Sequence, residues 1–288
     1  MASRIELMGL LLTGILSLLL LYVYGPRLSE GNFSLFTINI KPISPIIRTT
    51  YTCKTWQNIS FIDATKYQAC LTSYSDASFW SVQGLRHTAH KHLFNSSSLI
   101  IEVGGNRAHD TVEFIKFHNP FIMSYEPLRL MAKNLSDMFR SNPKVQIFPY
   151  GFGNRARNMS IEPNDYGNAG TSLYRPLTSP NSSNIVQVEI LDIVEVIDNI
   201  RRTKTRNGMI DMISINCEGC EFEIIPALLI NNLTQFFRVI QFASHMGLVQ
   251  DSPCIYCQIK QGLERTHTTL FYYSKLWEGW VLKNKTNI

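Results

Sequence analysis

Short apolar runs alternate with amphipathic stretches from residue 99 onward, and this alternation predicts strands and helices in turn. Such a chain typically forms a sheet with helices on both faces, so we expect an α/β fold with a Rossmann-like, doubly wound, mostly parallel sheet. Near the end, 270–273 and 280–282 flank Glu278-Gly279 and predict a closing antiparallel hairpin. The expected strands are 99–103, 121–125, 145–148, 210–215 and 239–242, and the expected helices are 110–117, 128–139, 191–200 and 221–229.

An uncharged apolar run occupies residues 7–23, interrupted only by Thr13 and Ser17. Its length is at the lower end of what crosses a bilayer as a helix. A cleaved signal peptide is the alternative, but no small-x-small cleavage site follows the run, and Tyr22 and Tyr24 suit a membrane interface. We therefore expect a transmembrane signal-anchor, and either interpretation sends the rest of the chain across the membrane.

The remaining segments follow from composition. Residues 1–6 are the expected cytoplasmic tail, and residues 24–50 mix Pro, Gly, Ser and Thr as a stem would. Residues 51–95 carry irregular aromatic positions and predict a small helical cap, which Cys53 and Cys70 could staple. The α/β domain is expected over residues 96–288.

Glycosylation sequons indicate the side of the membrane on which this domain lies. Chance would give about three in a chain of this composition. The excess favours a lumenal domain of the endoplasmic reticulum or Golgi and a single-pass type II topology. The eight sequons begin at Asn32, Asn58, Asn95, Asn134, Asn158, Asn181, Asn232 and Asn284.

Six cysteines form an even set, which suits an oxidising compartment and allows 15 full pairings. Cys217-x-x-Cys220 and Cys254-x-x-Cys257 could also make a zinc site. Disulfides are favoured, because Cys217 ends a predicted strand, Cys220 opens a predicted helix, and the gap between the two pairs exceeds that of zinc ribbons. The histidines show no metal-binding spacing either, so no metal centre is expected.

The formal net charge of +5 is mild for a chain of 288 residues. Its densest basic cluster, residues 201–206, falls where a helix should end, and basic residues there complement the helix dipole. A polyanion site is the less favoured interpretation. No nucleic-acid partner is expected.

The first predicted strand runs into the glycine-rich turn Gly104-Gly105-Asn106. Glycines at such a turn let the backbone approach a ligand at the carboxyl edge of the sheet, although a tight turn without a ligand would look the same. Glu102, just before the turn, could hold a cationic amino group. His109, just after it, lies where it could line the same site or cap the following helix.

The second predicted strand ends at Glu126-Pro127, about one βα unit further on. A carboxylate at that place can accept hydrogen bonds from a ribose diol, which is a recurring device of nucleoside sites. No G-x-G-x-x-G occurs, and this disfavours a nicotinamide dinucleotide.

The strand at 210–215 leads into Asn216-Cys217-Glu218-Gly219-Cys220-Glu221, and here a family resemblance becomes specific. The chain resembles the FkbM family of S-adenosylmethionine-dependent methyltransferases. That family shows D-x-G-x-N-x-G after the first strand, an acid and Pro after the second, and K-x-D-x-E-G-x-E after the fourth. The match covers about residues 99–245. It implies S-adenosyl-L-methionine as cofactor, bound by Glu102, Gly104, Gly105, Asn106, His109, Glu126 and Asn216.

Four positions depart from the family pattern: Glu102 replaces Asp, Ala108 replaces Gly, Ser214 replaces Lys and Asn216 replaces Asp. Asn216 matters most, because it loses a carboxylate. After the fifth predicted strand comes His245, where the family often carries a histidine. His245 and Glu218 are the candidate catalytic residues, since an imidazole titrates near neutral pH. A structural histidine is the more frequent alternative.

The expected function is O-methylation of a hydroxyl on a secretory-pathway substrate, with a glycan as one acceptor class. The alternative is a catalytically inactive methyltransferase-fold interaction protein of the secretory membrane, which the departures at residues 108, 214 and 216 motivate. A glycosyltransferase is disfavoured because the chain contains no D-x-D motif.

Overall fold

The computed structural model describes residues 40–48, 52–53, 62–73, 83–164, 170–179 and 182–284. The predicted tail and membrane span, residues 1–23, lie outside these ranges. Among the helices within them, none is long and apolar enough to cross a membrane. The predicted α/β domain, by contrast, is described almost throughout.

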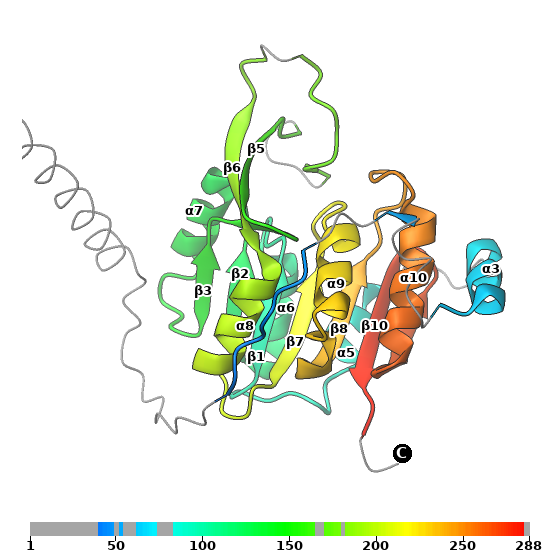
Figure 1. Ribbon diagram of the computed structural model, residues 1–288. Coiled ribbons are helices and arrows are strands. Elements are labelled where there is room, and N and C mark those ends of the chain that lie inside the picture. Colours follow the sequence, from blue (N-terminus) through cyan, green and yellow to red (C-terminus); the bar gives the residue numbers. More distant parts are fainter. Residues whose placement is uncertain are drawn as a thin grey trace, which may run out of the picture. The chain divides into compact units, whose positions relative to one another are not determined.

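A seven-stranded sheet forms the centre of this domain (Figure 1). Its order is β3-β2-β1-β7-β8-β10-β9, and the pairs that β10 forms with β8 and β9 are antiparallel while the others are parallel. The predicted mostly parallel sheet is therefore confirmed. The strands are β1 (Leu99–Val103), β2 (Phe121–Tyr125), β3 (Val145–Phe148), β7 (Ile210–Ile215), β8 (Phe237–Ala243), β9 (His267–Tyr273) and β10 (Trp277–Leu282).

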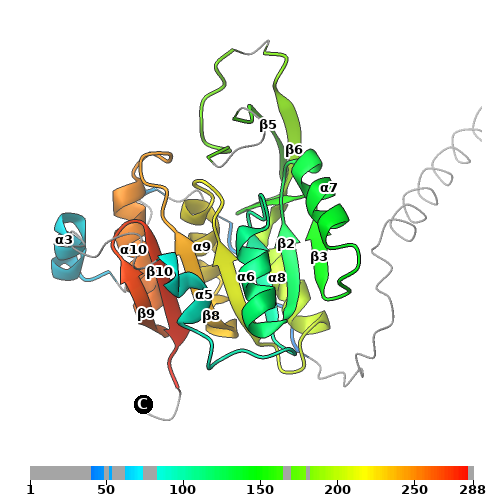
Figure 2. The same ribbon diagram turned by 180° about the vertical axis from the view of Figure 1, so that it is seen from behind.

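Helices cover both faces of the sheet, as a doubly wound fold requires. Figure 1 shows α8, α9 and α10 in front of the strands, and Figure 2 shows α5, α6 and α7 on the opposite face. Because neither face meets solvent, Ile100, Ile101, Met212 and Ile213 of the central strands are all 0% exposed. The helices are α5 (Leu85–Thr88), α6 (His109–His118), α7 (Arg129–Met138), α8 (Ile193–Thr203), α9 (Glu221–Ile230) and α10 (Ser252–Glu264), with a 3₁₀ turn, η2, at Thr234–Phe236.

A second, three-stranded sheet was not predicted. It has the order β4-β6-β5, from β4 (Gly151–Gly153), β5 (Arg157–Ile161) and β6 (Val186–Asp192). Ile161, Val188 and Ile190 form its small apolar cluster. Figure 1 shows β5 and β6 projecting beyond the end of the large sheet at which the parallel strands finish.

The predicted cap differs from expectation. Its described part includes α3 (Ala64–Thr72), which packs against α10. The proposed staple between Cys53 and Cys70 is wrong, because Cys53 is bonded to Cys254 and Cys70 to Cys257. Cys254 and Cys257 lie one helical turn apart on α10 and so reach two segments on the same side. The cap is thus covalently part of the α/β domain.

The predicted stem also ends earlier than expected. Residues 40–48 lie along α8 in Figure 1 and bond to the domain. Arg48 Nε donates to Asp192 Oδ2 at 2.6 Å, and the Ile47 N–H donates to Asn231 Oδ1 at 2.7 Å. This stretch belongs to the same compact unit as the α/β domain.

The closing hairpin is confirmed, but its turn is not at Glu278-Gly279. Both residues lie inside β10, and the turn occupies residues 274–276. A Cβ on Gly279 would come within 2.3 Å of the Phe271 ring, so this glycine allows close packing between β9 and β10. Helix α10, which precedes the hairpin, was not predicted.

Candidate functional site

The turn after β1 has a backbone that only certain residues tolerate. Gly104 has φ +93°, and a Cβ there would lie 2.1 Å from the carbonyl oxygen of Asn216. The Gly104 N–H donates to the Tyr125 carbonyl at 2.9 Å, which joins this turn to the end of β2. The glycine is thus required by the packing of three strand ends, before any ligand is considered.

Glu126 follows β2 and is 5% exposed. Its Oε2 accepts the Asn106 N–H and its Oε1 accepts the Leu128 N–H, both at 2.9 Å. Burial raises the pKa of Glu126, and the two N–H donors offset part of that rise. The carboxylate is therefore fixed in orientation by the backbone on both sides of it.

The ends of β1, β2 and β7 and the small sheet enclose a cavity. Gly104, Asn106, Glu126 and Asn216, four of the predicted cofactor residues, line it, and so does Glu218, a predicted catalytic residue. They come from three separate turns of the sequence. The parallel strands bring these turns together because their carboxyl ends meet at one edge of the sheet.

Asn106 contributes an uncompensated polar atom to this site. Its Oδ1 is buried and has no hydrogen-bond partner among the described residues. A buried acceptor without a donor is costly, and such atoms in native sites are often satisfied by a ligand or water. Asn106 thus combines a main-chain N–H bonded to Glu126 with a buried amide oxygen that lacks a donor.

The other three predicted cofactor residues are not among the described residues that line the cavity. Glu102 is 2% exposed, and its Oε2 accepts from the hydroxyls of Ser124 and Thr111, the latter at 2.6 Å. Burial raises the pKa of Glu102 to about 7, and these two hydroxyls counteract that effect. Gly105 is buried against Ser124 and Leu135.

His109 opens α6 and is exposed. The sequence alone left two roles for it, in the site or at the helix start. The structure shows it at the helix start, and the N-cap position before it is Ala108 in a left-handed conformation with φ +66°. Ala108 thus holds a backbone conformation that glycine adopts at lower cost.

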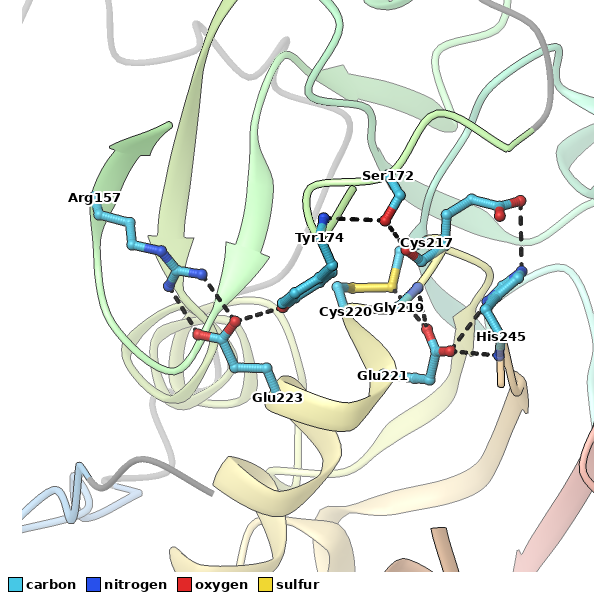
Figure 3. The surroundings of a disulfide bond; sticks show 10 residues. Arg157, Ser172, Tyr174, Cys217, Gly219, Cys220, Glu221, Glu223 and His245 are labelled. Carbon is cyan, nitrogen blue, oxygen red and sulfur yellow. Dashed lines mark hydrogen bonds and ion pairs between the residues drawn. A yellow bond between two sulfur atoms is a disulfide. The ribbon is translucent and has the colours of Figure 1, made fainter. Parts of the chain in front are cut away.

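The turn between β7 and α9 carries the acid-Gly step. Glu218 has φ +55° and Gly219 φ +114°, and Cys217 is bonded to Cys220 across them (Figure 3). All four cysteines of the two C-x-x-C pairs are thus in disulfides. Cys217 is bonded to Cys220, Cys254 to Cys53 and Cys257 to Cys70. The Gly219 N–H donates to Glu221 Oε2 at 3.0 Å, which ties the turn to the first residue of α9.

His245 follows β8 and contacts two glutamates (Figure 3). Glu221, which is 0% exposed, accepts from the His245 main-chain N–H at 2.7 Å and from its Nδ1 at 3.0 Å. Nε2 lies 3.5 Å from Glu218 Oε1. Burial lowers the pKa of His245, but the hydrogen bond and charge of Glu221 and the charge of Glu218 outweigh burial and raise it overall. His245 thus reaches the cavity wall through Glu218.

Part of the site was missed by sequence reasoning. The segment 170–175 forms one wall of the cavity through Gly170, Thr171 and Leu173. Ser172 Oγ donates to the Glu218 carbonyl at 2.5 Å, and Tyr174 packs on Gly219. No periodic pattern marked this segment, and its position depends on contacts with a distant turn.

Glu223, on the first turn of α9, fastens that wall. Its carboxylate accepts two hydrogen bonds from Arg157 at 2.7 and 2.8 Å and one from the Tyr174 hydroxyl at 2.5 Å (Figure 3). It also accepts the Asn154 N–H at 2.8 Å. Burial raises the pKa of Glu223, but these donors together hold it below its ordinary value. Burial and the neighbouring Glu223 raise the pKa of Tyr174, so its hydroxyl keeps the proton that it donates. The carboxylate thus connects the small sheet to the helix beside the cavity.

No protein-family model matches the chain, and no curated protein sequence matches it. Several solved structures are similar. An O-methyltransferase from Bacillus cereus in complex with SAH is 12% identical, with a TM-score of 0.39 over 81% of this chain and 100% of its own. Precorrin-6y C5,15-methyltransferase from Geobacter metallireducens is 11% identical, with a TM-score of 0.37 over 74% and 93%. The Methanococcus jannaschii fibrillarin pre-rRNA processing protein is 10% identical, with a TM-score of 0.36 over 66% and 69%.

Proposed function

We propose that this chain is an S-adenosylmethionine-dependent methyltransferase. The observation that carries the proposal is the convergence of the Gly104 turn and the Glu126 carboxylate on one cavity. Either feature alone is compatible with a tight turn or a structural acid. Together they form the kind of surface that holds a nucleoside, because one supplies close backbone and the other a fixed pair of acceptor oxygens.

The residues present fit the proposed cofactor. Glu126 would accept hydrogen bonds from the ribose diol, since each carboxylate oxygen has capacity beyond its single N–H donor. Asn106 Oδ1 would accept from a ligand group and so lose its uncompensated burial. Asn216 would line the remaining part of the cavity. When bound, S-adenosylmethionine supplies an electrophilic methyl group on a sulfonium sulfur.

We assign proton removal to Glu218 and His245. Glu218 lines the cavity and His245 lies behind it, 3.5 Å away. The Glu218 carboxylate would accept a hydrogen bond from the acceptor hydroxyl and take its proton. His245 is held at Nδ1 by Glu221, so Nε2 faces Glu218 and stabilises its charge until the proton arrives.

We further propose that the acceptor is a hydroxyl of a secretory-pathway molecule, with glycans as the first class to test. The expected compartment supports this part of the proposal. Three disulfides within one domain suit an oxidising lumen, and the excess of glycosylation sequons also favours a lumenal domain. A type II signal-anchor at residues 7–23 in an endoplasmic reticulum or Golgi membrane completes the proposal, together with kinship to the FkbM family.

A catalytically inactive interaction protein remains the second candidate, and it now depends on one residue. Ala108 is 0% exposed in the helix cap, and Ser214 is 1% exposed and accepts a hydrogen bond from Gln241 at 2.9 Å. These two departures therefore lie outside the cavity wall. Only Asn216 replaces a family carboxylate within it. If the native chain is inactive because this carboxylate is missing, Asn216→Asp should create activity.

Isothermal titration calorimetry of the full-length protein with S-adenosylhomocysteine, the demethylated product, tests the cofactor assignment. Saturable binding is expected, and no heat at millimolar ligand would overturn the proposal. Mass spectrometry of secreted glycans with and without the protein then tests the reaction through a 14-dalton difference. Binding without any methylated product, with activity gained on Asn216→Asp, would favour the inactive alternative.

A further inference from the structure

A disulfide between Cys217 and Cys220 lies in the wall of the cavity (Figure 3). Its cysteines are three positions apart, whereas those of the other two disulfides are 187 and 201 positions apart. The long-range bonds hold α10 to distant segments. The short bond closes only the turn between β7 and α9, and a short closed loop restricts the unfolded chain least. The principal effect of this bond is therefore local.

We propose that Cys217–Cys220 is a redox-active disulfide that exchanges with a dithiol reductant, and that its reduction releases the turn carrying Glu218 and weakens ligand binding in the cavity. The exchange stands on the geometry of the turn alone. The effect on binding rests on the proposed function.

Access to the two sulfurs is unequal, as directed exchange requires. Cys217 is partly exposed, whereas Cys220 is 1% exposed, so an incoming thiolate reaches Cys217. Cys220 occupies the N-cap of α9, where the helix dipole favours a thiolate. Two acids in the first turn oppose this, but Arg157 neutralises Glu223, and His245 lies against Glu221. Cys220 is thus placed to leave.

The exchange takes place in two steps. A reductant thiolate attacks Cys217 Sγ, the Cys217–Cys220 bond breaks, and Cys220 departs as a thiolate that takes up a proton. The second reductant thiol loses its proton and attacks the mixed disulfide, which releases Cys217 and leaves the reductant as a disulfide. Two electrons and two protons have passed to the protein.

In the reduced state, the Cys217 thiol would have a hydrogen-bond acceptor nearby. Glu221 Oε2 lies 3.5 Å from Cys217 Sγ, so a Cys217 thiol would have a carboxylate acceptor beside it. Glu221 also accepts the Gly219 N–H, which remains in either redox state. Reduction is therefore accommodated within the turn and needs no rearrangement of the sheet.

The turn couples the sulfurs to the cavity because its backbone is held in a strained conformation. Glu218 has φ +55°, a region that costs a residue with a side chain free energy. Its carbonyl accepts from Ser172, and its carboxylate lies beside His245. Opening the disulfide removes the covalent restraint on this residue. The Glu218 side chain and the segment at Ser172 then lose their fixed places in the cavity wall.

A redox titration of the full-length protein tests the exchange. The protein is equilibrated in buffers with rising ratios of reduced to oxidised dithiothreitol, free thiols are alkylated, and each cysteine is quantified by mass spectrometry. Cys217 and Cys220 should become labelled together, at a lower ratio than Cys70 and Cys257. The proposal is overturned if they become labelled last, or only when the protein unfolds.

Calorimetry with S-adenosylhomocysteine tests the coupling. Selective reduction should weaken binding about fivefold or more, the lower end of typical coupling between sites, and the Cys217→Ser/Cys220→Ser variant should bind as weakly with or without reductant. Near-UV circular dichroism checks that this variant is folded. The matched Cys70→Ser/Cys257→Ser variant should keep its response to the reductant.

Equal affinities of the oxidised and reduced protein would overturn the coupling. If the oxidised protein does not bind at all, the proposed function fails and the coupling fails with it. The titration still decides the exchange in that case, so the two failures are distinguishable.

Discussion

The main-chain N–H of Asn106 donates to Glu126 Oε2 at 2.9 Å, which joins the turn after β1 to the acid after β2. The two residues are 20 positions apart and line the same cavity. Because the Leu128 N–H holds the other carboxylate oxygen, Glu126 cannot rotate away from the cavity without breaking a backbone hydrogen bond. The site is thus ordered by the protein itself.

Glu126→Gln should weaken S-adenosylhomocysteine binding about tenfold or more, the value of one or two hydrogen bonds to a charged group. Glutamine retains the volume but replaces one acceptor oxygen with an NH₂ group, which would face either Asn106 N–H or Leu128 N–H, both donors. Calorimetry on the folded variant measures the change. Glu189→Gln, an exposed substitution on β6, is the control and should bind as the native protein does. Native affinity in Glu126→Gln would contradict the assignment.

His245 should show a raised pKa that depends on Glu221. A titration followed by NMR should place the midpoint above about 6.5, the ordinary value. Glu221→Gln should lower it, because the variant removes both the charge and the strongest acceptor at Nδ1. A midpoint unchanged by this substitution would mean that Glu221 does not orient the ring.

The raised pKa of His245 should make the stability of the folded protein depend on pH. A raised histidine pKa stabilises the folded protein fully below pH 6.5, and this contribution is lost as pH rises through the folded-state value. The free energy of unfolding should therefore decrease with rising pH above about 6.5 in the native protein. In His245→Gln that part of the slope should be absent.

The strands that build the site could be predicted because burial on both faces leaves short, mostly apolar runs. Residues 99–103 and 121–125 are identical to the observed strands β1 and β2, and 210–215 to β7. The small sheet could not be predicted in the same way. β6 alternates buried and exposed residues, but Val188 and Ile190 are buried against β5 and against Leu128 and Leu173, which is a tertiary circumstance.

The site residues also differ in how far the sequence could predict them. Glu126 and Asn106 were predictable because the ends of neighbouring parallel strands must meet. Glu102 was predicted to bind the cofactor, but it is not among the described residues that line the cavity, because its position before the turn does not reveal which side of the strand its carboxylate occupies. Ser124 and Thr111 hold it within the protein. Tyr174 gave no signal, since its partner Glu223 is 49 positions away in sequence.

Glu223→Gln should lower the free energy of unfolding by about 2 kcal/mol or more, because a charged acceptor of four hydrogen bonds is lost and Arg157 is left half-buried without its counter-charge. Denaturant unfolding measures the loss. The control is Glu195→Gln on α8, whose exposed ion pair with Arg48 should contribute about 1 kcal/mol or less.

The Glu223 carboxylate should also make the free energy of unfolding fall at acid pH, which we call the acid limb of stability. Its pKa is held below the ordinary value, so its contribution is complete above about pH 4.3 and is lost as pH falls through the lowered folded-state value. Glu223→Gln should flatten the acid limb. An unaltered limb would show that other carboxylates dominate there.

Gly104→Ala tests whether the glycine of the first turn serves the fold or only a ligand. A methyl group at this position would approach the Asn216 carbonyl oxygen to 2.1 Å, and φ +93° is unfavourable for alanine in any surroundings. The variant should therefore lose about 2 kcal/mol or more of stability with no ligand present. Gly84→Ala is the matched control, since nothing lies within 4 Å of its Cβ and the φ of −69° suits alanine, so it should be neutral or slightly stabilising.

A thermal unfolding midpoint that falls for Gly104→Ala alone would mean that this glycine is required by the junction of β1 and β7 whatever the cavity holds. Equal midpoints for the two variants would mean that the turn relaxes freely, and then the cavity seen between these strands would not be a fixed one.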